Sequence, residues 1–385
     1  MKKTLRTRAV TVTATLALAA VAVAACSPPA KNASSGGGGS GSGTSTGPDA
    51  ATAASAMDFG GMNGLVKAAK AEGTLNVIAL PPDWANYGTI IKAFEKKYGI
   101  KVNSAQPDGA SQDEINAAKQ LKGTDRAPDV FDLGQSVALA NTSMFAPYKV
   151  QTFGKIGKQF KDPKGTWVND YGGIISIGYN SKKVPAVTSL DDLLKPAYKG
   201  SVALNGDPTQ AGAAFSGVVM AALANGGSAD DVAPGVDFFV KLKKAGNFLP
   251  VDPTPTTIES GQTPVVIDWD YTNAAETPKV PGWKVMVPGN AVVGGYYFQA
   301  INAQAPHPAA ARLWEEFLFS DEGQNLYLQG GARPVRADDM KKAGTLDAKA
   351  FAKLPAVHGT PVIPTNAQTT KDAEYLSKNW SKVTS

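Results

Sequence analysis

A short apolar run that stops at acidic and aromatic residues constrains the fold of this chain most. The run Val265–Ile267 has the pattern of a strand covered on both faces, as in a parallel or mixed sheet. The segment 268–271 follows directly and holds two carboxylates and two large aromatic rings. In open α/β sheets, ligands bind in the crevice beyond the carboxyl ends of the strands. Two interpretations are open: these side chains line such a crevice, or the rings pack under a loop while the aspartates are solvated or cap a helix.

The same order of strand, loop and helix repeats along the chain. Leu75–Leu80 is predicted to be a strand, a helix then ends at Gly99, and Ile100 begins the second strand. Further strands are predicted over Ala127–Leu133, Tyr171–Asn180, Ser201–Leu204, Trp283–Pro288 and Val292–Ile301. Helices that alternate with strands in this way predict an α/β fold with mixed sheets flanked by helices.

Aromatic, acidic or amide residues follow these strands in five loops from both halves of the chain. Convergence on one cleft is the simplest physical reason for this repetition, although a loop tryptophan can also serve packing alone. The predicted ligand-binding residues are Trp84, Tyr87, Gln135, Ser136, Asp207, Gln210, Asp268, Trp269, Asp270, Tyr271, Tyr296 and Tyr297.

The length of the body indicates two lobes. About 325 residues exceed what a single hydrophobic core usually supports. Two strands, near 171–180 and 292–301, are suited to cross between the lobes. We predict that residues 58–172 and 297–385 form the first lobe, with C-terminal helices, and that residues 173–296 form the second.

The beginning of the chain reads as an export signal and a tether. A basic start is followed by an apolar run from Ala9 to Ala25, which predicts a signal peptide over residues 1–25. Small residues before Cys26 resemble the bacterial lipobox, which predicts a lipid attached to Cys26. Residues 26–57 are rich in Gly, Ser, Ala and Thr and are predicted to be a flexible linker. We therefore expect the protein at the extracellular face of the cytoplasmic membrane, held by its lipid.

Charge and composition exclude several classes of function. The formal net charge is +5, but four of the positive residues lie in the predicted signal peptide, so the remaining chain is close to neutral and gives no electrostatic reason for nucleic-acid binding. The sequence has 2 histidines and 1 cysteine, which disfavours a zinc site. His307 and His358 lie in loops without a nucleophile motif nearby. We expect a monomer that is not an enzyme and has no catalytic residues, metal or cofactor.

Four segments resemble a known family. They are Leu190–Leu204, Ile258–Gln262, Ala305–Gln324 and Gly330–Arg336. Over roughly residues 64–336 the chain is similar to the solute-binding proteins of bacterial ABC importers, of the polyamine- and ferric-ion-binding type. The resemblance implies a two-lobe periplasmic-binding fold of type II, a small-molecule ligand held between the lobes, and delivery to ABC permease subunits in the membrane.

The resemblance favours an amine ligand but does not fix it. Trp84 and Tyr87 match aromatics that sandwich an alkyl chain in polyamine binders, and Asp207 matches an acid that takes an amine. Two positions depart from that pattern: Gln210 stands where a second acid is usual, and Tyr297 replaces another carboxylate.

Other ligands and roles stay open. A ferric ion would use phenolate and carboxylate oxygens from Asp270, Tyr271, Tyr296 and Tyr297, although only half of the usual tyrosine pair is present. A phosphonate would use loop N–H groups near Ser111 or Gln135 and Ser136, together with Arg333. A surface sensory lipoprotein or an enzyme with the same cleft is the second alternative.

Overall fold

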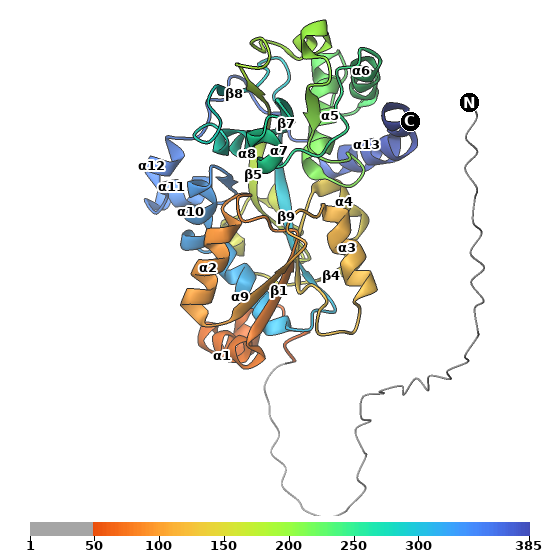
Figure 1. Cartoon of the computed structure of the whole chain (residues 1–385). Coiled ribbons are helices and arrows are strands. Elements are labelled where there is room, and N and C mark those ends of the chain that lie inside the picture. Colours follow the sequence, from red (N-terminus) through yellow and green to blue (C-terminus); the bar gives the residue numbers. More distant parts are fainter. Residues whose placement is uncertain (1–48) are drawn as a thin grey trace, which may run out of the picture. The chain divides into compact units, whose positions relative to one another are not determined.

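The computed structural model of the protein describes residues 49–385, and Figure 1 shows their arrangement. The predictions on the signal peptide and Cys26, and most of the linker, lie outside the described residues. Within 49–385, no helix combines the length and the apolar character that crossing a membrane requires. Two groups of elements lie one above the other, and the strands β5 (Val168–Asn180) and β9 (Gly294–Asn302) run between them. The predicted α/β fold is confirmed.

The first lobe is the lower group in Figure 1. Its strands are β1 (Thr74–Ile78), β2 (Lys101–Ala105), β3 (Val130–Leu133), β4 (Phe145–Ala146) and β10 (Arg333–Pro334). Its helices are α1 (Met62–Glu72), α2 (Tyr87–Tyr98), α3 (Ser111–Gln120), α4 (Gln135–Ala140), α9 (Pro308–Leu318), α10 (Asp321–Gln329), α11 (Ala337–Ala343) and α12 (Ala348–Phe351). Short 3-10 helices cover Ala56–Phe59, Thr142–Met144, Phe153–Lys155 and Lys158–Phe160.

The second lobe is the upper group. Its strands are β6 (Val202–Leu204), β7 (Val265–Trp269) and β8 (Trp283–Met286), and its helices are α5 (Gly212–Ala224), α6 (Ala233–Lys244), α7 (Pro255–Glu259) and α8 (Asp270–Ala275). Short 3-10 helices cover Leu190–Leu194 and Pro196–Tyr198. The chain ends in α13 (Asn366–Asn379) and α14 (Ser381–Thr384).

One continuous sheet connects the lobes. Among residues 49–385 its strand order is β3-β9-β5-β7-β6, while β1 and β2 form a separate parallel pair. The first half of β5 pairs with β9 as far as Ile174, and the second half pairs with β7 from Ile175 onward. The change of partner between these two neighbouring residues therefore marks where the sheet passes from one lobe to the other.

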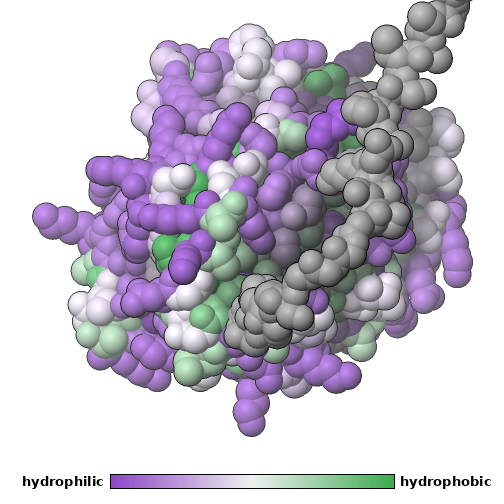
Figure 2. Space-filling view, turned by 90° about the horizontal axis from the view of Figure 1, so that it is seen from below, coloured by the Kyte–Doolittle hydropathy of each residue, from purple (hydrophilic) through white to green (hydrophobic). Residues whose placement is uncertain are grey.

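Burial of apolar helix faces holds each lobe together. In the first lobe, Trp314 and Phe317 of α9 are fully buried and pack against Phe94 of α2, with ring centroids 5.1 and 5.7 Å from that of Phe94. Such buried aromatic side chains dominate the energetics of a core. The face seen from below in Figure 2 is mostly hydrophilic, with small apolar areas between the charged side chains.

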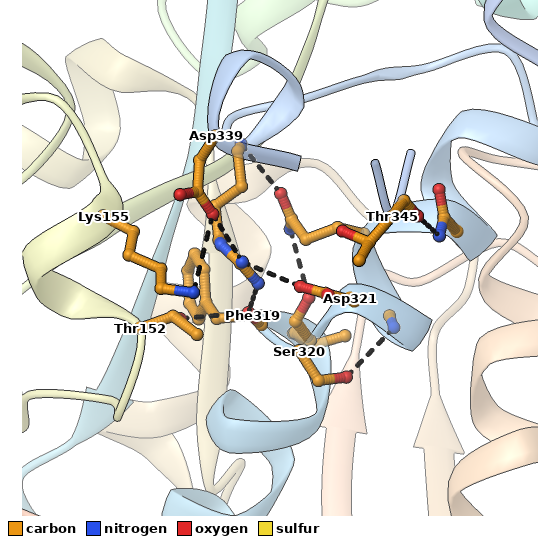
Figure 3. Close-up of polar contacts among 12 residues, drawn as sticks. Thr152, Lys155, Phe319, Ser320, Asp321, Asp339 and Thr345 are labelled. Carbon is orange, nitrogen blue, oxygen red and sulfur yellow. Dashed lines mark hydrogen bonds and ion pairs between the residues drawn. The ribbon is translucent and has the colours of Figure 1, made fainter. Parts of the chain in front are cut away.

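The segment Gly330–Arg336, which carries part of the family resemblance, serves the architecture of the first lobe. Arg336 is 1% exposed. Its partners Phe319, Asp321 and Asp339 are labelled in Figure 3. Its guanidinium donates to the carbonyl of Phe319 at 2.7 Å and pairs with Asp321 and Asp339, each at 2.7 Å. Lys155 reaches the same Asp339 at 4.0 Å. These contacts fix α10 and α11 against each other.

Several element boundaries differ from those predicted. β7 continues through Trp269 because its backbone pairs with Ile175 and Ser176 of β5, so Asp268 and Trp269 belong to the strand and not to a loop. Asp270 and Tyr271 begin α8. These pairing partners are distant in sequence, which is why the end of the apolar run did not reveal them.

The predictions for two further pairs of residues had different outcomes. Gln135 and Ser136 were expected in a loop but form the first turn of α4, so the chain passes from β3 into a helix with only Gly134 between them. Tyr296 and Tyr297 lie in the interior of β9, where the strand pairs with β5, which agrees with the strand predicted over Val292–Ile301 and means that they are not in a loop beyond it.

The C-terminal helices contact both lobes. α13 packs on α4 and α6, and α14 packs on α6. The Trp380 ring meets that of Phe239 at 5.4 Å. The predicted assignment of all residues 297–385 to the first lobe stays a prediction, as do the other lobe boundaries.

Candidate functional site

The candidate site is a cavity of about 190 Å³ between the two lobes. Loops and helix ends of both lobes reach it, and β9 supplies one wall. Its lining includes Trp84, Ser111, Glu114 and Asp132 from the first lobe, Asn205, Gly212 and Thr254 from the second, and Tyr297 from β9. Closure of the lobes therefore completes the walls of this cavity, as expected for a ligand held at an interlobe crevice.

The aromatic wall consists of Trp84 and Tyr297, which line the cavity, and of Tyr271, which packs on Trp84 without being part of the lining. Trp84 lies in the loop after β1, where Ala85 and Asn86 have positive φ angles of 45° and 69°. Its ring meets those of Tyr271 and Tyr297 edge to face, with centroids 5.6 and 5.8 Å apart. Edge-to-face packing of this kind stabilises the arrangement by roughly 0.5–1.5 kcal/mol for each pair. The wall thus joins the first lobe, the second lobe and the crossing strand.

Glycines in the crossing strands make room for these rings. A Cβ atom at Gly173 would lie 2.8 Å from Cε1 of Tyr271, and one at Gly295 would lie 2.8 Å from Cη2 of Trp269. Real Cβ atoms do not approach carbon atoms this closely. The glycine pairs in β5 and β9 therefore allow the aromatic side chains of the second lobe to rest directly on the crossing strands.

A second layer of tyrosines lies behind the wall. The ring of Tyr171 stacks between those of Tyr297 and Tyr327, with centroids 5.3 and 4.6 Å away. The indole N–H of Trp84 donates to the hydroxyl of Tyr171 at 2.7 Å, and this hydroxyl donates to Oδ2 of Asp132 at 2.8 Å. The aromatic wall is therefore hydrogen-bonded to a carboxylate of the cavity.

Two buried carboxylates face the cavity from the first lobe. Glu114 is 1% exposed and Asp132 is 6% exposed, and Oε2 of Glu114 accepts the backbone N–H of Asp132 at 2.9 Å. Loss of water raises the pKa of Asp132 to about 7, and loss of water together with the charge of Asp132 raises the pKa of Glu114 well above its ordinary value. Oδ1 of Asp132 has no hydrogen-bond partner within residues 49–385.

The charge of the cavity has one sign. Asp108 and Asp252, both exposed, add two more carboxylates to the lining. No lysine, arginine or histidine of the described residues is among those that line it. The lining therefore favours a positive ligand over an anion.

The structure brings some predicted site residues together at this cavity. Trp84 and Tyr297 line it; Tyr271 packs against the Trp84 ring, and Trp269 packs against the Tyr297 ring. Tyr87 is buried in the layer behind, where its hydroxyl lies 3.0 Å from that of Tyr327.

The other acidic residues that were predicted lie elsewhere. Asp268 lines a separate cavity of about 60 Å³, and burial raises its pKa to about 6. Asp270 pairs with Arg333 at 2.6 Å and accepts the backbone N–H of Ile174 at 3.0 Å. Asp207 accepts both the N–H and the hydroxyl of Thr209 in a local turn, at 2.7 and 2.6 Å. None of these three carboxylates is among the lining of the 190 Å³ cavity between the lobes.

The remaining predicted residues surround the cavity at a distance. The backbone carbonyl of the exposed Gln210 accepts from Gln112 across the lobes at 3.4 Å. Gln135 and Ser136 lie behind Tyr297 at a narrow cavity of about 20 Å³, and Tyr296 packs on Phe160 at 4.7 Å. The role of every predicted residue in binding stays a prediction.

Glu114, Asp132 and Tyr171 were not predicted as site residues. A carboxylate inside the short apolar strand Val130–Leu133 was the available signal, because a charged side chain in such a strand requires a partner or a function. Tyr171 gave no signal, because its role depends on neighbours from other elements.

Comparison with known proteins assigns the family. A family model described as bacterial extracellular solute-binding protein matches residues 128–355. The chain belongs to this family. Among curated protein sequences, none matches the chain.

Solved structures share the fold of this chain. Iron-bound HitA from Pseudomonas aeruginosa shares 22% identity at a TM-score of 0.60, over 80% of this chain and 99% of that one. AgtB from A. tumefaciens R10 in complex with agropinic acid shares 13% at a TM-score of 0.65, over 81% and 99%. The spermidine/putrescine ABC transporter substrate-binding protein PotD from Streptococcus pneumoniae shares 18% at a TM-score of 0.53, over 81% and 99%. At these identities the similarity shows the fold, which is the predicted type II periplasmic-binding fold.

The predicted resemblance to solute-binding proteins is thereby confirmed. The family consists of binding proteins, in agreement with the expectation that the chain is not an enzyme, although the absence of catalysis stays a prediction. The ligand of this solute-binding protein is not fixed by these similarities, because the three structures named here have different ligands in their descriptions.

Proposed function

We propose that this solute-binding protein captures a small organic amine, of the polyamine type, between its lobes and delivers it to an ABC permease. One observation carries the proposal: the interlobe cavity combines buried carboxylates with aromatic walls, and no basic side chain of residues 49–385 lines it. A protonated amine with an alkyl chain complements each of these features.

The contacts that such a ligand would make follow from the lining. An ammonium group near Oδ1 of Asp132 would supply the partner that this oxygen lacks among the described residues, and would offset the burial of Glu114. Trp84 and Tyr297 would hold the methylene chain and attract the charge through their ring faces. We expect charge-assisted hydrogen bonds to provide the specificity and the rings to provide most of the contact area.

A ferric ion is the second candidate. The hydroxyls of Tyr171, Tyr271 and Tyr297 belong to rings that pack on one another, and that of Tyr271 has no partner within residues 49–385. Phenolate oxygens suit ferric iron. Burial raises the pKa of all three phenols, however, so an incoming metal would have to displace protons that this environment holds firmly. We therefore rank the amine first.

A phosphonate is less compatible with the site. Arg333, the arginine predicted to bind that ligand, is paired with Asp270 and lies outside the cavity lining. Ser111 accepts the backbone N–H of Gly134 at 2.9 Å, and the cavity lining beside it offers no basic side chain of residues 49–385 to neutralise an anion.

The sequence supports a tethered location. Its basic and apolar start, the small residues before Cys26 and the Gly/Ser-rich linker are the basis for proposing an exported monomer that is lipid-anchored through Cys26 at the outer face of the cytoplasmic membrane. A sensory lipoprotein would share these features. Uptake of labelled ligand by membrane vesicles that contain the permease would separate transport from sensing.

A thermal-shift screen tests the ligand class. The protein, with Cys26→Ser to avoid lipidation, is unfolded and refolded to remove carried ligand, and is then melted with putrescine, spermidine, ferric citrate, 2-aminoethylphosphonate or phosphate. We expect stabilisation by the polyamines, because a ligand that binds only the folded state raises its melting temperature. Stabilisation by ferric citrate alone would replace the first candidate by the second.

A pair of variants tests the cavity. Asp132→Asn should weaken putrescine binding by on the order of tenfold or more, because it removes one charge of a charge-assisted contact. Asp207→Ala is the matched control: the sequence resemblance predicts an equal loss, whereas the turn that holds Asp207 predicts little change. Wild-type affinity in Asp132→Asn, measured by calorimetry, would refute the proposed site.

A further inference from the structure

Tyr171 lies between the aromatic wall and the carboxylate of the cavity without lining the cavity itself. It is fully buried, and its ring is held on both faces by Tyr297 and Tyr327. Its hydroxyl is thus the polar link between Trp84 on one side and Asp132 on the other.

The direction of these two hydrogen bonds is fixed by chemistry. An indole N–H donates and cannot accept, so the Tyr171 hydroxyl must accept from Trp84. The single proton of this hydroxyl is then directed to Oδ2 of Asp132, 2.8 Å away. The second oxygen, Oδ1, remains without a partner in the described part of the chain and belongs to a side chain that lines the cavity.

We propose that Tyr171 is a positioning residue, which uses the N–H of Trp84 to direct its own proton to Asp132 and so keeps that carboxylate ionised and turned towards the ligand. This inference rests on the proposed function, because it takes Asp132 as the group that binds the cation. Trp84 belongs to a loop that borders the cavity, so the position of that loop would control how well the carboxylate binds.

The surroundings of Asp132 explain why it needs such a donor. Its titratable neighbours are Tyr87 of α2, Glu114 of α3, Asp170 and Tyr171 of β5, Tyr271 of α8, Tyr297 of β9 and Tyr327 of α10. None of these side chains carries a positive charge, and two of them, Glu114 and Asp170, are carboxylic acids. Burial raises the pKa of Asp132, whereas the hydrogen bond from the Tyr171 hydroxyl lowers it. Loss of the Tyr171 hydroxyl should therefore raise this pKa further.

The test compares Tyr171→Phe with Tyr327→Phe. Both changes remove one hydroxyl from a fully buried ring in the same stack, but the Tyr327 hydroxyl donates to Asp170, which does not line the cavity. The affinity for putrescine is measured by calorimetry from pH 6 to pH 9. Because the cation binds the ionised form of Asp132, affinity rises as pH rises through its titration.

We expect Tyr171→Phe to bind putrescine on the order of tenfold more weakly at pH 7 and to approach wild-type affinity at pH 9, since one unit of pKa corresponds to a tenfold change. Tyr327→Phe should show no such shift of the affinity profile towards higher pH. Trp84→Phe keeps a ring in the wall but removes the N–H. Its profile of affinity against pH should therefore shift towards higher pH, as in Tyr171→Phe, but by a smaller amount.

Two outcomes would overturn the inference. A loss in Tyr171→Phe that is equal at every pH would mean that the hydroxyl matters only for packing, and a profile that overlays the wild type would mean that it has no role. Asp132→Asn separates this inference from the proposed function. If that variant keeps wild-type affinity for putrescine, the proposed function is refuted, regardless of the affinity of Tyr171→Phe.

A second measurement needs no ligand. The carboxyl resonance of Asp132 is followed by pH titration of the apo protein labelled with ¹³C-aspartate, and Asp132→Asn identifies the signal. The midpoint should be higher in Tyr171→Phe than in wild type, and it should not be raised in Tyr327→Phe. An equal midpoint in Tyr171→Phe and wild type would refute the proposed role of the hydroxyl.

Discussion

A contact between two glycines predicts which single methyl group would hold the lobes apart. Gly134 precedes α4 of the first lobe, and Gly212 begins α5 of the second. A Cβ atom at Gly212 would lie 3.0 Å from the Cα atom of Gly134, and the next nearest atoms are the hydroxyl oxygen and Cζ of Tyr297, at ordinary distances of 3.6 and 3.8 Å. We therefore expect Gly212→Ala to disturb closure of the lobes and nothing within either lobe.

The size of the effect follows from this distance. Two carbon atoms prefer a separation of roughly 3.5–4.0 Å, so the added methyl group requires the backbones to separate by roughly 0.5–1 Å. Overpacking of this order costs about 1–3 kcal/mol when the contact is enforced. In the apo protein the lobes can stay open, so the clash does not lower its stability. Ligand binding requires closure, so the clash reduces the binding free energy. Putrescine affinity should fall by about tenfold, which corresponds to about 1.4 kcal/mol, while the apo melting temperature stays the same.

The matched control lies within one lobe. A Cβ atom at Gly235 of α6 would lie 2.2 Å from the backbone oxygen of Val218 in α5. Gly235→Ala should therefore lower the apo melting temperature and leave the affinity of the folded protein unchanged. Calorimetry measures the putrescine affinity, thermal unfolding measures the apo melting temperature, and small-angle scattering measures the closure of the lobes. If Gly212→Ala lowers apo stability as Gly235→Ala does and leaves the putrescine affinity unchanged, the contact between the two glycines is also present in the apo protein. The proposed effect on closure would then be wrong.

Two further predictions concern charged pairs. Arg333→Gln leaves the buried carboxylate of Asp270 without its cation, so the free energy of unfolding should fall by roughly 3 kcal/mol; a loss below about 1 kcal/mol in urea unfolding would show that the pair is not needed. The hydrogen bond from His307 to Asp129 raises the pKa of this histidine above 6.5. The stabilisation by the His307–Asp129 pair is therefore fully present below pH 6.5 and is lost as pH rises through the raised pKa of His307. The difference in unfolding free energy between wild type and His307→Gln should accordingly become smaller as pH rises. A difference that does not depend on pH would contradict this assignment.

Local patterns were sufficient for the order of the elements. The run Val265–Ile267 became a buried strand because both of its faces are covered, as the absence of alternation predicted. The helix end predicted at Gly99 also agrees with the structure, since this glycine has the positive φ that ends a helix. The predicted strand ends were less accurate, because backbone pairing with β5 extends β7 by two residues beyond the apolar run.

The identity of the acids at the cavity could not be derived in the same way. Asp207 is followed by Pro208 and Thr209, a turn pattern, and the structure shows its carboxylate bound within that turn. The partner of Asp270 is Arg333, 63 residues later in the chain. Whether a carboxylate is free for a ligand depends on such distant partners.

The sequence by itself determined the fold class, the family and the presence of aromatic and acidic residues near strand ends. These depend on periodicity, on local turn chemistry and on motifs, all of which are properties of neighbouring residues. The tertiary structure decided which of those residues share a cavity. Trp84, Asp132 and Tyr171 come from three separate elements, and only the pairing of β3, β9 and β5, together with the loop after β1, places them within hydrogen-bonding distance.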